Sequence, residues 1–298
     1  MGIYDEIIQS FKKGTVLTKL IYVNIAVFVV IKFVQVLFFL SGYPGDETEF
    51  IVDWLAIPAN IPSLLTKPWT IITYMFLHVG FIHILFNILW LYWFGRIFLQ
   101  YLSERKMLGV YILGGLAGAL FYIASFNLFP AFEDVVLMSR ALGASAAVLA
   151  IVISISVYVP EYTIYLLFLG PVRIKYIAVV IVILDILNIA SHNAGGHIAH
   201  LGGAFFGYMF ISQYRKGKDL TKGVLWAVDN LATFLKPRKK IRVTYRNETP
   251  KTDYEYNKQK AEKQKVIDNI LEKISKSGYE SLTKEEKEIL FKMSSRNN

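Results

Sequence analysis

The chain has 298 residues, of which 54% are hydrophobic, 15% aromatic and only 18% charged, and its mean hydropathy is positive. This composition departs from that of soluble globular proteins and indicates a protein with several membrane spans. The absence of cysteine excludes disulfides, thiolate metal sites and a cysteine nucleophile.

The formal net charge of +9 is concentrated toward the C-terminal end of the chain. Residues 1–213 carry 11 basic and 11 acidic side chains, whereas residues 214–298 carry 21 and 12, so the whole excess lies in the tail. A basic tail attached to membrane spans favours anionic lipid headgroups over nucleic acid as its partner. We therefore expect the tail to contact lipid and expect no nucleic acid.

Six apolar segments approach or reach the roughly 20 residues that a transmembrane helix needs. They cover residues 16–41, 80–101, 107–129, 144–160, 175–191 and 196–213. The fourth and fifth are near the minimum length. The first is too long and lacks a following small-residue cleavage site, so it is expected to stay as an anchor. The predicted fold is an all-α membrane protein, with a six-helix bundle over residues 16–213 after a cytoplasmic segment 1–15.

Charged residues between the segments predict the orientation of the bundle. Arg96, Arg105 and Lys106 lie between the second and third segments, and further basic residues precede the first and fifth. The remaining connections are mainly acidic. By the positive-inside rule, the basic ends and both termini are cytoplasmic. Lysine, isoleucine and asparagine usage, without an organellar targeting segment, is consistent with a bacterial inner membrane.

The connection 42–79 is long and combines turn signals, such as Pro44-Gly45, with apolar stretches. It is too broken to span a membrane. We expect a loop partly sunk in the outer leaflet, where protein or water must satisfy its free backbone groups.

Two further regions follow the bundle. Residues 214–240 repeat apolar side chains at helical spacing, include Trp226 and end in the basic run 236–240, which predicts an amphipathic interfacial segment. In residues 241–298, a polar linker that ends before Val266 precedes a predicted helical hairpin with a stop at Gly278 and a capping box from Thr283 to Glu286. The hairpin either docks a protein partner or only solubilises the tail.

Polar residues gather at the predicted outer ends of the second and sixth segments. All five histidines lie there or in adjoining loops, where ionisable groups are costly and mark a functional region. His83 and Asn87 are four residues apart and therefore share one helical face. Taken alone, this pair favours a structural hydrogen bond between helices over a functional role.

The fourth and sixth segments supply a serine and another histidine. Ser145 follows Gly143 at the outer end of the fourth segment, and His200 lies in a stripe with Gly203 and Gly207 at helical spacing. Small residues allow close helix packing, which would bring Ser145 and His200 together. Glycine stripes also pack helices without any catalysis, but that interpretation does not explain the histidine in the stripe.

A serine and a histidine at the same depth predict acyl-transfer chemistry without a metal or cofactor. His200 would take the proton of Ser145, whose alkoxide attacks an amide carbonyl, and would return it to the leaving amine. The Asn87 amide, His83 and the backbone N–H of Ser145 would stabilise the oxyanion, each by on the order of 3 kcal/mol.

The ordered set of motifs over about residues 68–213 resembles the rhomboid proteases. The motifs are His83-x-x-x-Asn87, Gly143-x-Ser145 and Ala199-His200-x-x-Gly203-x-x-x-Gly207. This resemblance implies a rhomboid-like bundle with an active site that opens to the outer face. It implies substrates that are membrane proteins, cut near the outer end of an unstable transmembrane helix. It also implies gating of the fifth segment against the second, in which Phe86 takes part.

Two features depart from this pattern or are not covered by it. The family's loop usually carries Trp-Arg where this chain has Trp69-Thr70, which puts the rigidity of the loop in doubt more than the activity. Asp185 in the fifth segment either faces the water-filled site or pairs with a polar group, for which Lys32 and Asn188 are candidates, and we favour the pairing.

Three other functions compete with proteolysis. One is a catalytically silent rhomboid-like protein that binds membrane clients; such proteins usually lose the serine or the histidine, and this chain has both. Another is a metal site or transporter built from His83, His197 and His200, which a chelator would reveal. A third is a channel, which needs a polar line through the full depth of the bundle. His78 and His197 are interpreted as polar lining.

Overall fold

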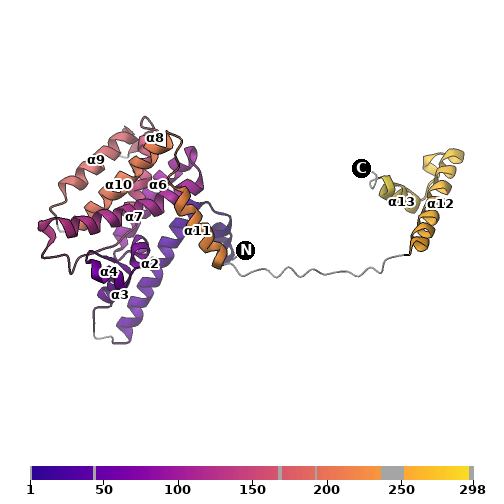
Figure 1. Ribbon diagram of the computed structural model, residues 1–298. Coiled ribbons are helices and arrows are strands. Elements are labelled where there is room, and N and C mark those ends of the chain that lie inside the picture. Colours follow the sequence, from indigo (N-terminus) through magenta and orange to yellow (C-terminus); the bar gives the residue numbers. More distant parts are fainter. Residues whose placement is uncertain (1, 43–44, 167–169, 192, 236–251, 295–298) are drawn as a thin grey trace. The chain divides into compact units, whose positions relative to one another are not determined.

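The computed structural model describes residues 2–42, 45–166, 170–191, 193–235 and 252–294. The chain divides into two compact units, Met1–Lys236 and Pro237–Asn298 (Figure 1). The predicted basic run 236–240 and His192 lie outside the described residues.

Each of the six predicted segments contains a helix. In chain order the helices of the first unit outside the loops are α1 (Ile3–Lys13), α2 (Val16–Leu40), α6 (Phe81–Tyr101), α7 (Glu104–Leu128), α8 (Ser145–Tyr158), α9 (Ile174–Leu187), α10 (Ala194–Tyr214) and α11 (Lys222–Leu235). Among the described helices, α2, α6 and α7 are long and apolar enough to cross a membrane. Helices α8 and α9 have only 14 residues each, and α10 is not among the three, so the count of six spans stays a prediction.

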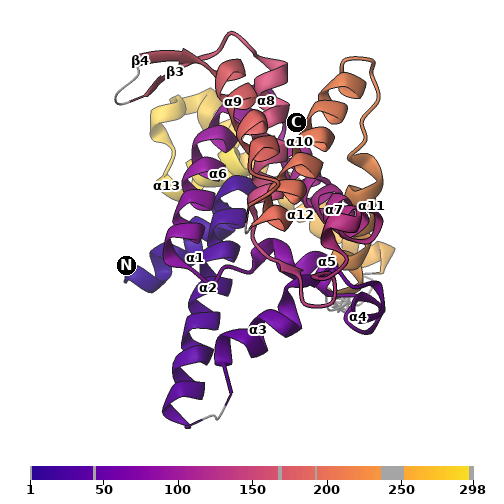
Figure 2. The same cartoon turned by 90° about the vertical axis from the view of Figure 1, so that its left-hand side faces the viewer.

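The connections contain short elements of their own. They are α3 (Glu47–Leu55), β1 (Ile57–Pro58), α4 (Ile61–Thr66), α5 (Thr70–Thr73), η1 (Tyr74–Phe76), η2 (Pro130–Phe132), β2 (Arg140–Ala141), β3 (Thr163–Leu166) and β4 (Gly170–Arg173). Strand β1 pairs antiparallel with β2, and β3 pairs antiparallel with β4. The β3–β4 hairpin and helices α3 to α5 lie at opposite ends of the bundle (Figure 2).

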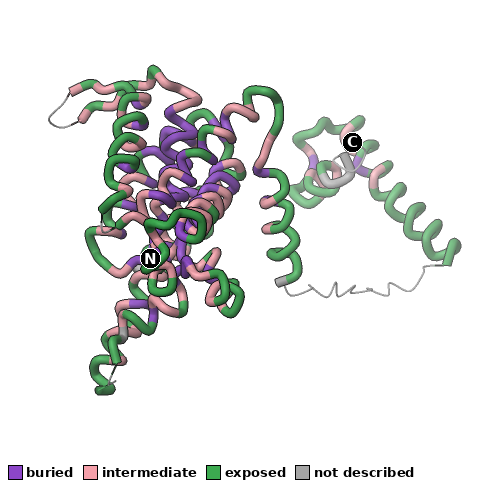
Figure 3. The backbone as a smooth tube through the Cα atoms, turned by 60° about the vertical axis from the view of Figure 1, so that its left-hand side comes forward, coloured by how far each residue is buried: buried purple, intermediate pink, exposed green. Residues whose placement is uncertain are grey.

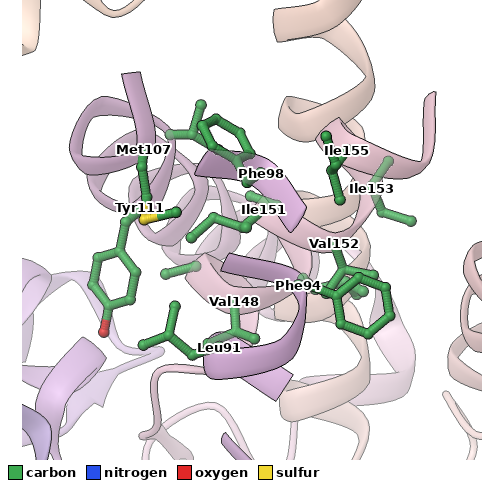
Figure 4. Packing of buried hydrophobic residues seen from close by; sticks show 14 of the residues in the cluster. Leu91, Phe94, Phe98, Met107, Tyr111, Val148, Ile151, Val152, Ile153 and Ile155 are labelled. Carbon is green, nitrogen blue, oxygen red and sulfur yellow. The ribbon is translucent and has the colours of Figure 1, made fainter. Parts of the chain in front are cut away.

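Helix α8 forms the centre of the bundle, and nearly its whole length is buried (Figure 3). Its apolar side chains Val148, Ile151 and Ile155 belong to a cluster with residues of α6 and α7, including Phe98 and Met107 (Figure 4). A helix that is apolar on all sides is typical of such a position. The helix that begins with Ser145 is therefore enclosed by the other helices of the bundle.

Glycines bring α10 and α7 into close contact with α8. A Cβ added to Gly203 would lie 2.1 Å from the carbonyl oxygen of Ala146, and one added to Gly207 would lie 2.5 Å from that of Ala150. On the opposite side, Gly118 of α7 approaches the Cβ of Ala146. The predicted close packing of the sixth segment on the fourth is confirmed, and close approach of backbones is what stabilises helix pairs in lipid.

We expect Gly203→Ala to destabilise the bundle, because the added methyl group meets backbone atoms that cannot move without shifting α8. The expected loss of unfolding free energy is on the order of 1–3 kcal/mol. Gly223→Ala on α11 is the matched control, since a Cβ there meets nothing within 4 Å. Denaturant titration in detergent checks both, and equal midpoints for the two variants would contradict the close packing.

The connection 42–79, whose rigidity the missing arginine puts in doubt, is held by other contacts. Thr70, which stands where the family's loop usually has arginine, is buried and donates to the carbonyl oxygen of Lys67 at 2.7 Å. Lys67 forms an ion pair with Asp53, and Arg140 donates to Asp53 at 2.8 Å. The hydrogen bond from Lys67 lowers the pKa of the Asp53 carboxyl. Arg140 therefore supplies a guanidinium to this loop from a different connection.

After α10, the structure contains the helix predicted within 214–240 and the two helices of the predicted hairpin. Helix α11 leaves Trp226, Leu231 and Phe234 exposed, as an interfacial segment would, while lipid binding itself stays a prediction. The described residues of the second unit form α12 (Asp253–Ser277), η3 (Tyr279–Ser281) and α13 (Lys284–Ser294).

The local signals of the hairpin are confirmed. Gly278 ends α12 with φ +76°, Thr283 N donates to Glu286 Oε2 at 2.7 Å, and Glu286 N donates to Thr283 Oγ1 at 3.3 Å. The predicted polar linker is too long at its C-terminal end, because α12 already begins at Asp253. Strong helix formers fill residues 258–265, and Thr252 caps the helix by accepting from Glu255 N.

Candidate active site

Ser145 is the first residue of α8 and follows a tight, fixed connection. Gly143 has φ +121°, a conformation that favours glycine, and its N–H donates to the carbonyl oxygen of Tyr74 at 2.8 Å. The N–H of Ala144 donates to His78 Nε2 at 3.3 Å. The N–H groups of the first helical turn have no intrahelical acceptor, so that of Ser145 is available to an anion.

His78 accepts the hydrogen bond that holds this connection, and it does not line the cavity described below, contrary to its prediction as polar lining. Its side chain is fully buried, and its Nδ1 lies 3.2 Å from the carbonyl oxygen of Phe76. Burial lowers the pKa of His78 to about 4, so the ring is neutral near pH 7. A neutral ring that donates through Nδ1 and accepts from Ala144 through Nε2 is fully satisfied.

Helix α6 brings His83 and Asn87 to the same place. A Cβ on Gly143 would lie 2.8 Å from His83 Cε1, 2.9 Å from His83 Nε2 and 3.7 Å from Ser145 Oγ. Glycine is therefore required at position 143 both by its φ and by the ring beside it. Asn87 is buried and donates through Nδ2 to the carbonyl oxygen of His83 at 2.9 Å, which leaves its second N–H for another acceptor.

A cavity of about 730 Å³ collects these side chains. Ser145, His200, His83, Asn87 and Phe86 all line it, together with apolar residues of α6, α8 and α9. Phe86 is more than half exposed. Gly203 and Gly207 do not line the cavity and instead pack α10 against α8. The lining also includes Asn193 and Gly196 at the start of α10, but none of the described residues of the connection 42–79.

Asp185 pairs with polar side chains, as favoured from the sequence, but the suggested partners Lys32 and Asn188 are wrong. Lys32 donates to Gln35 and Asn188 to the carbonyl oxygen of Leu184, whereas Asp185 Oδ1 lies 2.9 Å from His200 Nδ1. Nor does Asp185 line the cavity; it is buried behind His200. The prediction failed because only packing of α9 on α10 decides which face of α9 meets the histidine.

His197 has a similar position and is likewise not cavity lining. Its Nδ1 lies 2.8 Å from the same Oδ1 of Asp185. The potential ligand atoms of Asp185, His197 and His200 all lie within 4.8 Å of one another, so among the described residues this trio is a metal-ligand candidate, while His83 is not part of it. Hydrogen bonds of 2.8 and 2.9 Å already satisfy both Nδ1 atoms without an ion.

Residues 65–216, just over half of the chain, match a protein-family model described as the Rhomboid domain. The chain belongs to the rhomboid family. With its apolar helices, this rhomboid is a membrane protein. Residues 251–296 match a second model, described as a family of unknown function (DUF6576).

Named relatives agree with the family assignment. The chain is 32% identical over 158 residues to RHOMBOID-like protein 12, mitochondrial, of Arabidopsis thaliana, covering 50% of this chain and 47% of the relative. It is 33% identical over 72 residues to Rhomboid protease GlpG of Salmonella newport (strain SL254), covering 24% of this chain and 25% of the relative. The match thus spans about half of the plant protein and a quarter of the bacterial one.

Sequence reasoning missed the neighbours of the histidines rather than the histidines themselves. Asp185 is the only acidic residue within the six predicted segments, and that isolation was the available signal. Nothing in the spacing of His78 indicated its bond to Ala144, because the contact joins residues 66 positions apart.

Proposed function

We propose that this rhomboid is an intramembrane serine endopeptidase that hydrolyses peptide bonds in or near transmembrane segments of membrane proteins. The observation that carries the proposal is the shared cavity, in which Ser145 and His200 lie with two hydrogen-bond donors of α6. Ser145 is the proposed nucleophile and His200 its general base. His83, Asn87 and the Ser145 N–H form the proposed oxyanion hole.

The reaction would proceed by acyl transfer. His200 Nε2 takes the proton of Ser145 Oγ, and Oγ bonds to the substrate carbonyl carbon. The oxyanion accepts hydrogen bonds from the α6 side chains and the Ser145 N–H. His200 then gives its proton to the leaving amine as the C–N bond breaks. Water, deprotonated by His200, then attacks the acyl carbon, and His200 returns the proton to Ser145 Oγ as the Oγ–C bond breaks.

The length of α8 supports a site below the membrane surface. Its 14 residues extend about 21 Å, which is less than the roughly 30 Å of the hydrocarbon core. If its C-terminal end lies at the cytoplasmic surface, Ser145 lies below the outer one. Phe86 of α6 and Ile181 of α9 line the same cavity, which is consistent with substrate entry between these helices.

The proposed setting follows the charge pattern. Both termini would be cytoplasmic, the cavity would open to the outer face, and the membrane would be a bacterial inner membrane, although the plant relative is named as mitochondrial. The basic tail would contact anionic headgroups, and the C-terminal hairpin would dock a protein partner.

Serine-directed chemistry tests this function. We expect the full chain in liposomes to cleave a transmembrane reporter, to resist a chelator, and to lose activity when a fluorophosphonate adds to Ser145. Mass spectrometry locates the adduct. Cleavage that needs a metal ion would overturn the proposal, and so would absence of both cleavage and labelling, which favours the silent client-binding protein.

A further inference from the structure

Asp185 lies next to His200, the proposed base, but has no role in the proposed mechanism. It lies in the last turn of α9, is 5% exposed, and places Oδ1 2.9 Å from Nδ1 of His200 and 2.8 Å from Nδ1 of His197. One carboxylate oxygen therefore joins both histidines of α10.

We propose that Asp185 is a positioning residue that fixes the tautomer and orientation of His200. This inference rests on the proposed protease function. An ionised carboxylate only accepts hydrogen bonds, so the proton of neutral His200 must be on Nδ1. Nε2 then carries the lone pair and is free to take the proton of Ser145. The arrangement adds a third member behind the dyad.

The second oxygen of Asp185 indicates why its contact with His200 favours the reaction. Within the described residues, Oδ2 is buried and has no hydrogen-bond partner. The negative charge of the carboxylate is thus stabilised only by the hydrogen bonds at Oδ1 while both histidines are neutral. When His200 takes the proton of Ser145, an imidazolium forms beside the carboxylate, and their attraction in a low dielectric is strong. This interaction arises only as the reaction proceeds, so it favours the transition state over the ground state.

The other ionisable groups around His200 do not offer an equivalent partner. His83 and Arg140 also line the cavity, but neither carries a carboxylate, and Arg140 is bonded to Asp53. Tyr122 of α7 packs against the start of α10 at Gly195.

At the opposite end of α9, Arg173 pairs with Glu161. The described part of α8 brings serines and apolar residues to this interface, without a carboxylate or an amine. Asp185 is therefore the carboxylate, among the described residues, that contacts the proposed base.

The test compares Asp185→Asn with His197→Ala in the full chain. The asparagine keeps the shape but can present an N–H to Nδ1, which selects the opposite tautomer. We expect kcat to fall by about 10²–10⁴-fold with KM changed less than about threefold, and fluorophosphonate labelling of Ser145 to slow in parallel. His197→Ala leaves the Asp185–His200 contact and should cost at most about tenfold, the scale of one hydrogen bond.

A spectroscopic readout separates positioning from stability. In protein labelled with ¹⁵N-histidine, the His200 signals, identified by their loss in His200→Ala, should place the proton on Nδ1 in the native chain. They should change in Asp185→Asn. An unchanged tautomer, or native kcat in Asp185→Asn, overturns the proposal.

Failure of the underlying function gives a different result. If Ser145→Ala still cleaves, the protease proposal fails whatever Asp185 does. If the native chain neither cleaves nor labels, the tautomer measurement alone decides the role of Asp185. Loss of native cleavage with a chelator would instead assign the Asp185 trio to a metal ion.

Discussion

Replacing Ser145 with alanine should lower kcat/KM for a transmembrane reporter by about 10⁴-fold or more, and His200→Ala should do the same. Both residues line one cavity, and the other histidine of its lining, His83, is assigned to the oxyanion hole. Because the two act as a unit, the double variant should be no worse than either single one. Kinetics in liposomes measure all three.

Ser156→Ala is the matched control for the serine. Ser156 lies on the same helix, is buried and has no hydrogen-bond partner among the described residues, so its loss should leave both folding and cleavage near native. Cutting that persists in Ser145→Ala would sink the proposed nucleophile. Strictly additive losses in the double variant would mean that Ser145 and His200 act separately.

Asn87→Ala should lower kcat by about 10²–10³-fold, equivalent to roughly 2.7–4 kcal/mol, with little change in KM. The reason is that one Nδ2 hydrogen is already given to the carbonyl oxygen of His83, which fixes the amide beside the cavity with its second N–H free. A donor held in place before the reaction stabilises the oxyanion without reorganisation. Steady-state kinetics at saturating reporter measure the effect.

Asn188→Ala offers a control of the same chemistry. Asn188 also donates through Nδ2 to the carbonyl oxygen four residues before it, at 2.7 Å, but it is exposed and does not line the cavity. Its removal should leave kcat unchanged. An increase of KM alone in Asn87→Ala would show that the amide stabilises the bound substrate and the transition state equally, and that it is no oxyanion donor.

Much of the site was predictable because it depends on short-range spacing. Helical periodicity alone placed His83 and Asn87 on one face, and the Gly203 stripe opposite Ala146 is a property of small side chains at that spacing. The length of the connection 42–79 also indicated a loop. The contact that holds this loop could not be predicted, because Arg140 and Asp53 are 87 positions apart in the sequence.

The sequence by itself determined that this protein is a helical membrane protein with a rhomboid motif set, because hydropathy and motif spacing are local properties of the chain. Only the tertiary structure decided that Asp185 lies behind His200 and that His78 holds the connection before Ser145. The side chain that meets a given face depends on how α9 rotates against α10 and how the loop folds onto α8. Packing fixes these contacts between distant residues, and no periodicity within one segment encodes them.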